Sequence, residues 1–372
     1  MTEFFIGDLR TGRRLMSLPI TSGSWSVGLN GPGSLSVSLT LLDPDVAALD
    51  LRSAATVGKS YLAAVEGDVI LEAGPIWTHG YSKDTGKLTL NGGGLWTYFD
   101  HRVLIPILAA GESPQGADSE YVGISLGTIA KRLVQQAQAH TGGNVPVVFS
   151  PDEAGTVEQV YKGADLKLVG DALNDLTQLE GGPEIEFLPQ WSEDRLSVRW
   201  LLRTGTNSNP QLASTATHVW DYSVSQPSIK GLEVNIDGSA IAGRAWATGG
   251  RSSSAALYGV YTNTTLTNQG YPLLEVVDSA HATDDTDELV QGYATELARV
   301  GSKPTEFWSF SVRADELPTL GQYRPGDFSE IRMANDPYIP DGKYRRRIVD
   351  MSGDQDGKWV KVTTGEVYSL TG

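Results

Sequence analysis

The sequence contains no cysteine, so disulfides, thiolate metal sites and thiol nucleophiles are excluded. A chain made and kept in a reducing compartment fits this composition. No run approaches the ~20 apolar residues that cross a bilayer, and the N-terminus lacks a basic segment followed by an apolar core. We therefore expect a protein that is neither embedded in a membrane nor secreted through a signal peptide.

Histidines are few, and the common catalytic motifs are missing. None of the five histidines stands four residues from another and there is no HExxH segment, so the sequence predicts no zinc site. No Gly-x-Ser-x-Gly elbow is present, which leaves acyl-transfer chemistry without support. The histidines are His79, His101, His140, His218 and His281.

Two glycine-containing segments resemble binding loops only in part. The glycines at 92–94 are not followed by the Lys-Ser/Thr pair of a phosphate-binding loop, and they predict a turn. Asp354 and Asp356 resemble the start of a calcium loop, but Gly357 stands at the fourth position and Gly365 takes the place of the glutamate at the twelfth. The sequence thus predicts no catalytic, cofactor-binding or metal-binding residue, and no cofactor.

One pair of acids invites comparison with glycosidases. Glu184 and Glu186 share one face of a predicted strand, and paired carboxylates carry out glycoside hydrolysis. Ile185 and Phe187 occupy the opposite face, which is the pattern of a strand with one solvated side. We expect a half-solvated strand here, and a polysaccharide-degrading enzyme stays as an alternative.

The nine tryptophans suggest a second alternative. Exposed aromatic rings stack on sugars, so a carbohydrate-binding module is compatible with this content. Most of the tryptophans lie within strand patterns, however, and core packing is expected for the majority. These include Trp25, Trp77, Trp200, Trp246 and Trp308.

Basic residues are also scarce. The chain has 29 of them against 45 acidic residues and a formal net charge of -16. This balance disfavours binding to a phosphate backbone as the main source of affinity. It suits solubility, or a passage through which DNA must slide without adhering.

What is abundant is glycine, with 42 residues, in a chain of 372 that is too long for one ordinary core. Turns rich in glycine indicate a mainly β protein. Residues 74–91 read as a β-hairpin around the turn at 83–86, and residues 343–363 repeat this plan around 353–357. The chain therefore uses the same hairpin twice.

The repeat extends upstream of both hairpins. A tyrosine strand near Tyr61, a Gly-Asp turn at 67–68 and a further strand precede the first hairpin. Tyr323, a Gly-Asp turn at 326–327 and a further strand precede the second. Such internal similarity predicts a duplicated β module.

The division that follows has three parts. Residues 1–112 form a first β-barrel module, since closure of the sheet removes its edges. Residues 113–228 form an α+β middle domain with a helix starting after Ser125, a helix over 165–180, and a hairpin. Residues 229–372 form a second β-barrel module with an inserted helix near 283–300. The fold class is mainly β, with antiparallel modules and an α+β insert.

This layout resembles the minor tail proteins, or baseplate hub proteins, of long-tailed bacteriophages, those of actinobacteria in particular. The resemblance covers nearly the whole chain. It is carried by Pro-Ile-Trp-Thr at 75–78, Gly-Gly-Gly-Leu-Trp at 92–96, His-Thr-Gly-Gly at 140–143, and Tyr-Arg-Pro-Gly-Asp at 323–327.

The resemblance implies a structural virion protein of the tail tip. Three subunits, each with two tube-like barrels, would close the tail tube as a ring, match its sixfold symmetry to a threefold tip and provide the channel for DNA ejection. Implied partners are the distal tail protein, the tape-measure protein and other tip or fibre proteins. Assembly would take place in the bacterial host cytoplasm. No enzymatic activity is implied for these residues, and a wall-degrading tail enzyme or a carbohydrate-binding module for host attachment are the alternatives.

Overall fold

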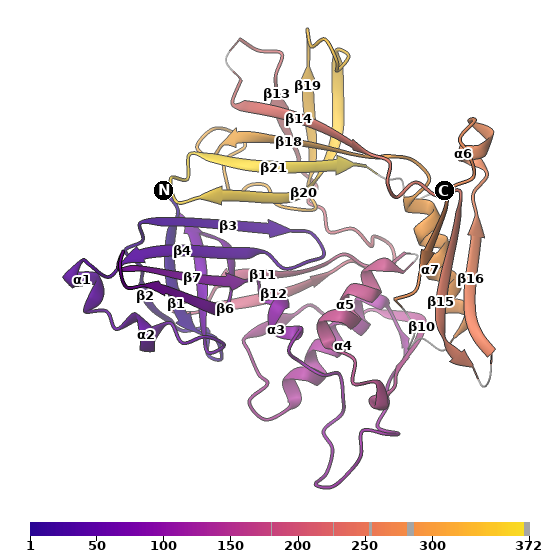
Figure 1. The fold of residues 1–372 in the computed structure, drawn as a ribbon, viewed down its shortest axis with the longest axis horizontal. Helices are drawn as coiled ribbons and strands as arrows, with labels where there is room; N and C mark the ends of the chain where they lie inside the picture. Colours follow the sequence, from indigo (N-terminus) through magenta and orange to yellow (C-terminus); the bar gives the residue numbers. More distant parts are fainter. Residues whose placement is uncertain (180, 226, 253–254, 281–285, 368–372) are drawn as a thin grey trace.

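The computed structural model describes residues 1–179, 181–225, 227–252, 255–280 and 286–367. Strands make up 44% of the chain and helices 16%, so the protein is mainly β, as the sequence predicts. Figure 1 shows the two β modules at the left and top of the view, a helical region below them and a separate small sheet at the right. Within the described residues, every helix is too short or too polar to cross a bilayer.

The first module is an antiparallel sheet in the order β3-β4-β7-β6-β5-β1-β2. Strand β4 follows the alternation expected from the sequence, with Leu35, Val37 and Leu39 buried on one face. A short helix follows β4, and Asp43 caps it by accepting a hydrogen bond from the Asp45 N–H. The elements are β1 (Glu3–Asp8), β2 (Arg14–Ser17), β3 (Ser22–Gly28), β4 (Ser34–Thr40), α1 (Pro44–Ala47), α2 (Leu51–Ala54), β5 (Ser60–Glu66), β6 (Val69–Ser82) and β7 (Lys87–Gly93).

Strand β5 is buried on both faces, which explains its unbroken apolar sequence. Leu62 and Ala64 point into the core that fills the β modules. Tyr61, Ala63 and Val65 belong to a second core, which the first module shares with the helical region. One sheet therefore supports two cores, and the middle of the chain packs on its outer face.

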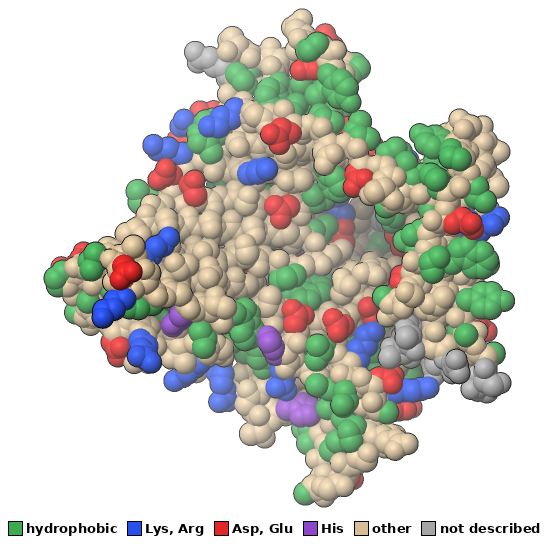
Figure 2. All heavy atoms as spheres, in the orientation of Figure 1, with side chains coloured by type: hydrophobic (Ala, Val, Ile, Leu, Met, Phe, Trp, Pro, Cys, Tyr) green, Lys and Arg blue, Asp and Glu red, His purple; other side chains and the backbone are tan. Residues whose placement is uncertain are grey.

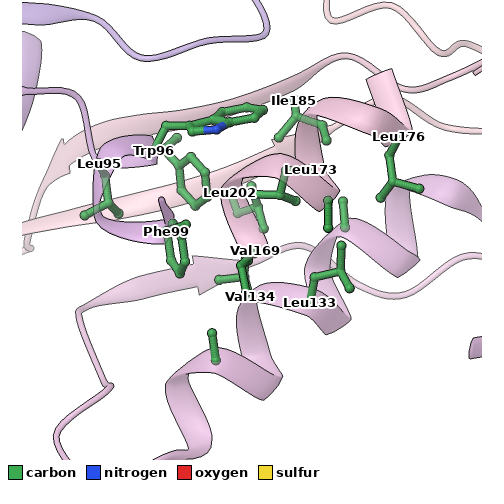
Figure 3. Close-up of a cluster of buried hydrophobic side chains, with 14 of the residues drawn as sticks. Leu95, Trp96, Phe99, Leu133, Val134, Val169, Leu173, Leu176, Ile185 and Leu202 are labelled. Carbon is green, nitrogen blue, oxygen red and sulfur yellow. The ribbon is translucent and has the colours of Figure 1, made fainter. Parts of the chain in front are cut away.

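The middle region places two main helices and two small sheets against this face. Figure 3 shows side chains from α3, α4, α5, β11 and β12 pointing toward one another in its core. Those labelled are Leu95, Trp96, Phe99, Leu133, Val134, Val169, Leu173, Leu176, Ile185 and Leu202. The elements are α3 (Trp96–Phe99), β8 (Ser119–Ile124), α4 (Leu126–Ala139), β9 (Val147–Phe149), β10 (Ala154–Tyr161), η1 (Gly163–Asp165), α5 (Val169–Gln178), β11 (Ile185–Trp191) and β12 (Val198–Thr204).

Both predicted helices are present. Ser125 caps α4 by accepting a hydrogen bond from the Thr128 N–H at 3.1 Å, as expected. The second helix begins at Val169 rather than Asp165, because Leu166 adopts a left-handed backbone with φ of 48° that ends a 3-10 turn. The expected end at Glu180 lies outside the described residues.

The second module has the order β14-β18-β21-β20-β19-β13. Its pairs are antiparallel except for β13 with β19, which is parallel. Strand β13 lies in the range assigned to the middle domain but pairs in the sheet of the second module. The elements are β13 (Thr217–Asp221), β14 (Ile229–Asp237), β18 (Thr305–Arg313), β19 (Phe328–Met333), β20 (Gly342–Asp354) and β21 (Trp359–Glu366).

The chain leaves the second module between β14 and β18 to form a small sheet covered by one helix (Figure 1). The helix expected near 283–300 is present over 287–300, and residues 281–285 lie outside the described part. Strand β15 has a bulge at residues 249–250, and Arg251 and Ser252 pair with β16 beyond it. The elements are β15 (Arg244–Ser252), β16 (Ala255–Thr262), α6 (Thr265–Asn268), β17 (Glu275–Asp278) and α7 (Asp287–Val300).

Candidate functional site

The two predicted hairpins share the same irregularity. In the first, β6 pairs with β7 and a bulge at Trp77 follows Ile76. In the second, β20 pairs with β21 and a bulge at Val349 follows Ile348, which stands 272 positions after Ile76. Bulges are specific features of a strand pair rather than random defects. The shared position therefore supports a true correspondence between the hairpins.

The strands around the hairpins also correspond. The order β3-β4-β7-β6-β5-β1 in the first module matches β14-β18-β21-β20-β19-β13 in the second. The last pair differs in direction, since β1 is antiparallel to β5 whereas β13 is parallel to β19. Six strands thus take equivalent places in the two modules.

The upstream part of the sequence repeat was wrong in detail. The Gly-Asp turn at 67–68 follows β5, whereas the turn at 326–327 precedes β19, the strand that takes the same place in its sheet. Tyr61 lies in β5, but Tyr323 lies outside any strand. Position in the sheet, rather than turn composition, identifies the counterparts.

The two modules join edge to edge, so that their strands form one continuous sheet of 13 strands. Strand β3 pairs antiparallel with the last residues of β20, from Gly28 opposite Asp350 to Ser24 opposite Asp354. At the centre of this pairing, the indole of Trp25 covers Gly353. A Cβ atom at Gly353 would lie 2.9 Å from the Trp25 ring. The module junction therefore requires a residue without a side chain at that place.

Replacement of Gly353 tests this junction. We expect Gly353→Val to lower the free energy of unfolding by roughly 1 to 3 kcal/mol, because the added side chain must displace the Trp25 ring. Urea denaturation followed by tryptophan fluorescence measures the effect. Gly31→Ala is the matched control, because a Cβ atom there meets no atom within 4 Å. Equal stability of the two variants would contradict a close-packed junction.

The acids Glu184 and Glu186 also lie at a junction, not on a solvated face. Both oxygens of Glu184 accept hydrogen bonds from the Arg347 guanidinium of β20. Glu186 pairs with Arg203 at 2.8 Å and with Arg324 at 3.2 Å. The two carboxylate side chains are only 12% and 10% exposed. The expectation of a half-solvated strand was therefore wrong, because arginines from distant segments cover this face.

These ion pairs give the two acids a structural role. The Glu184 carboxylate joins the residue just before β11 of the middle region to β20 of the second module, and Arg324 brings the loop before β19 to Glu186. A glycosidase needs two carboxyl groups that reach the glycosidic bond, whereas both of these carboxylates are covered and held by guanidinium groups. The geometry thus supports fastening of the modules rather than proton transfer.

A third carboxyl group, Glu72 of β6, is fully enclosed nearby. Its Oε1 accepts a hydrogen bond from the Ala73 N–H at 2.8 Å. Burial raises the pKa of Glu72 to about 8, against the lowering effect of the Ala73 N–H, and Glu186 adds to the rise. A Cβ atom at Gly33 would lie 2.1 Å from the Glu72 carboxyl group, and one at Gly94 3.0 Å from it. The expectation of a turn at 92–94 was wrong, because β7 continues to Gly93 and the glycine backbone closes over Glu72.

Two cavities open beside these junctions. One of about 280 Å³ lies among β3, β6, β11 and the loop at 320–325. The other, of about 720 Å³, lies between the middle region and the small sheet, with Glu184, Arg347, Glu296 and Arg299 in its lining. Figure 2 shows the molecule hollowed in this part. Both acids in its described lining, Glu184 and Glu296, are paired with arginine, so these described residues offer no free pair of converging acids.

The remaining sequence candidates are structural. The segment at 354–357 forms the turn of the second hairpin, with Gly357 at φ of 63°, as the turn interpretation predicts. No group of three or more potential metal ligands is found in the described part of the chain, which leaves out His281. Trp25, Trp200 and Trp308 are buried as expected, whereas Trp77 and Trp246 are half-buried. The buried rings cannot stack on a sugar.

The chain shares its fold with solved tail proteins, two of them from prophages. The tail protein from Neisseria meningitidis MC58 has a TM-score of 0.58 at 16% identity, over 98% of this chain and 96% of that one. The 43 kDa tail protein of prophage MuSo2 from Shewanella oneidensis has a TM-score of 0.58 at 11% identity, over 98% of each chain. The prophage tail protein gp18 from Listeria monocytogenes EGD-e has a TM-score of 0.50 at 11% identity, over 98% of this chain and 94% of that one.

No family model and no curated protein matches the sequence. Identities this low establish a shared fold, and the role of this chain must be argued from its own residues.

Proposed function

We propose that the protein is a structural component of a phage tail tip, a hub that closes the tail tube as a ring of three subunits. The observation that carries the proposal is the pair of modules with one strand order and one bulge position. Three such chains present six similar modules. A threefold assembly of this kind matches a sixfold tube above it.

The way the modules join supports a ring. Within one chain, β3 at the edge of the first module extends the sheet of the second through β20. This contact uses different surfaces on the two modules, and such heterologous contacts generate closed rings when the rotation closes. The expected closure of each module into a barrel is not present in the described strands, since the sheet runs as one open path from β14 to β2. In the ring, the modules would together surround a central channel.

The channel would carry DNA during ejection without binding it. A formal charge of -16 supports this idea, since a negative wall repels the phosphate backbone. The assembled ring should therefore show no retention of double-stranded DNA at physiological salt. A neutral or basic channel wall would defeat this part of the proposal.

The proposal places the protein in the virion, after assembly in the host cytoplasm, with the distal tail protein, the tape-measure protein and other tip or fibre proteins as partners. Phages of actinobacteria are the lineage that the sequence motifs favour. The division into residues 1–112, 113–228 and 229–372 belongs to the same proposal, with β13 crossing from the middle domain to the second module.

Sedimentation velocity of the purified chain, alone and with its distal tail partner, tests the proposal. We expect a trimer, either alone or once the partner is added. A chain that stays monomeric under both conditions would contradict a hub.

The alternatives make different predictions. A wall-degrading enzyme would lose peptidoglycan turnover when Glu184 or Glu186 is changed to glutamine, whereas the hub has no turnover to lose. A carbohydrate-binding module would change its tryptophan fluorescence when host wall polysaccharide is added. The arginine pairing of both acids and the burial of Trp25, Trp200 and Trp308 favour the hub.

A further inference from the structure

Two strand edges form the junction between the modules, the outer edge of β3 and the end of β20. Each of these edges has a counterpart in the other module. The counterpart of β3 is β14, which stands at the end of the continuous sheet with one side unpaired among the described strands. The counterpart of the end of β20 is the end of β6, whose residues from Thr78 to Ser82 pair only with β7 in the same described part. Among the described strands, the outer edge of β14 and the end of β6 therefore lack a partner, and they correspond to the two edges that meet at the internal junction.

The internal junction fixes how these two edges would pair. Positions in β6 follow from β20 by the spacing of 272 residues that relates Ile76 to Ile348. Positions in β14 are assigned from the strands beside them. Trp25 of β3 pairs with Leu35 of β4, and Val234 of β14 pairs with Trp308 of β18. Since Trp308 takes the place of Leu35, Val234 takes the place of Trp25. The pairing of Trp25 with Gly353 thus corresponds to Val234 with Tyr81.

The rest of the register follows in steps of one residue. In antiparallel order, Glu233 lies opposite Ser82, Asn235 opposite Gly80, and Asp237 opposite Thr78. The internal junction packs a large ring, Trp25, over a glycine. In the predicted pairing the large ring is Tyr81 on β6, and the smaller residue opposite it is Val234 on β14.

The side chains on both edges suit an interface. Ile236 of β14 is 51% exposed and Tyr81 of β6 is 59% exposed, although both stand within strands. Glu233 would lie beside Lys83 and Lys87, which are exposed at the turn of the first hairpin. Unpaired strand edges with apolar side chains readily add another strand. Opposite charges at one end of the pairing fix its register.

We infer that β14 of one subunit pairs with the end of β6 in a second copy of this chain, and that this contact closes the ring. The inference rests on the proposed hub function and assigns its subunit interface. Around the ring, every module is then joined to the next by the same kind of strand pair. Junctions within one chain alternate with junctions between two chains. The contact is heterologous, so it propagates from copy to copy until the ring closes.

Cysteine pairs test the register directly, because the natural chain has no cysteine. One chain carries Asn235→Cys and a second carries Gly80→Cys, and the two are mixed and oxidised. A second mixture uses Val234→Cys with Tyr81→Cys. Neighbouring antiparallel pairs alternate between wider and narrower spacing, so one of the two mixtures has the closer geometry. We expect covalent dimers of the two chains in at least one mixture.

The matched control mixes Asn235→Cys with Leu15→Cys, which places the second thiol on the edge strand β2 of the same module. Covalent dimers at the same yield in this control, or none in the two test mixtures, would overturn the inference. If the wild-type chain forms a trimer but neither cysteine mixture gives cross-links, the β14 to β6 contact would be wrong and the trimeric hub would stand. Cross-links in open-ended chains would support the contact and contradict the trimeric hub, and a monomer without cross-links would contradict both.

A charge placed on the edge gives an independent readout. Ile236→Asp should abolish the trimer in sedimentation while the monomer keeps its thermal unfolding midpoint, because the side chain is exposed in the single chain. Leu15→Asp is the control, since Leu15 is 48% exposed on another edge strand. A trimer that survives Ile236→Asp, or that is lost equally in both variants, would contradict the assigned edge.

Discussion

Arg347→Met is expected to lower the free energy of unfolding by roughly 3 to 5 kcal/mol, because it leaves the Glu184 carboxylate covered and without its cation. Arg347 donates to both Glu184 oxygens, to the Gly326 carbonyl at 2.9 Å and to the Leu212 carbonyl at 3.1 Å. One side chain thus fastens the second module to the middle region. Urea denaturation followed by tryptophan fluorescence measures the loss.

Two further variants make the result specific. Arg195→Met removes another ion pair between distant segments, with Asp68, but this pair is exposed and the variant should unfold almost as the wild type does. Adding Glu184→Gln to Arg347→Met should restore part of the stability, because the unpaired charge is gone. If Arg347→Met and Arg195→Met behaved alike, Arg347 would not be a fastening residue.

The second large effect is a loss of folding stability at high pH, caused by the buried Glu72. The pKa of Glu72 is raised from 4.5 to about 8, chiefly by burial. The folded state therefore holds this proton more tightly than the unfolded chain does. The stabilising contribution is complete below pH 4.5 and is lost as the pH rises through about 8. Between pH 5 and pH 9 the loss amounts to about 4 kcal/mol, because each tenfold difference in proton affinity between the two states corresponds to about 1.4 kcal/mol.

Glu72→Gln should remove this part of the pH dependence. The variant keeps the shape of the side chain without an ionisable group, so at pH 9 it should be more stable than the wild type. The groups that face Glu72 are the Ala73 N–H, Glu186 and Arg324. Urea denaturation at pH 5, 7 and 9 gives the comparison, with the exposed Glu3→Gln as control. Parallel curves for wild type and Glu72→Gln would contradict a buried, protonated Glu72.

The hairpins could be predicted because their signals are local. Glycines with positive φ, Gly86 and Gly357, stand in the turns, and alternating apolar residues such as Leu88 and Leu90 mark the strands. The helix after Ser125 was predictable for the same reason, since its cap and its apolar spacing lie within a few residues. Local rules determined these elements, and tertiary contacts did not override them.

The junctions could not be predicted from local patterns. Arg347 is 163 residues from Glu184, so the alternation around Glu184 indicated a solvated face where the fold supplies an arginine. The parallel pairing of β13 with β19 likewise depends on segments far apart in the sequence. Glu72 did leave a signal, because it is a lone acid within the apolar run of β6, and such a residue indicates burial at a special position.

The most direct test of the account is a cryo-EM reconstruction of the tail tip in the virion that contains this protein. We expect three copies around the tail axis, with six modules in one ring and β14 of each copy beside β6 of the next. A map that places the chain away from the tube axis, or that shows one module per copy in the ring, would contradict the proposed hub.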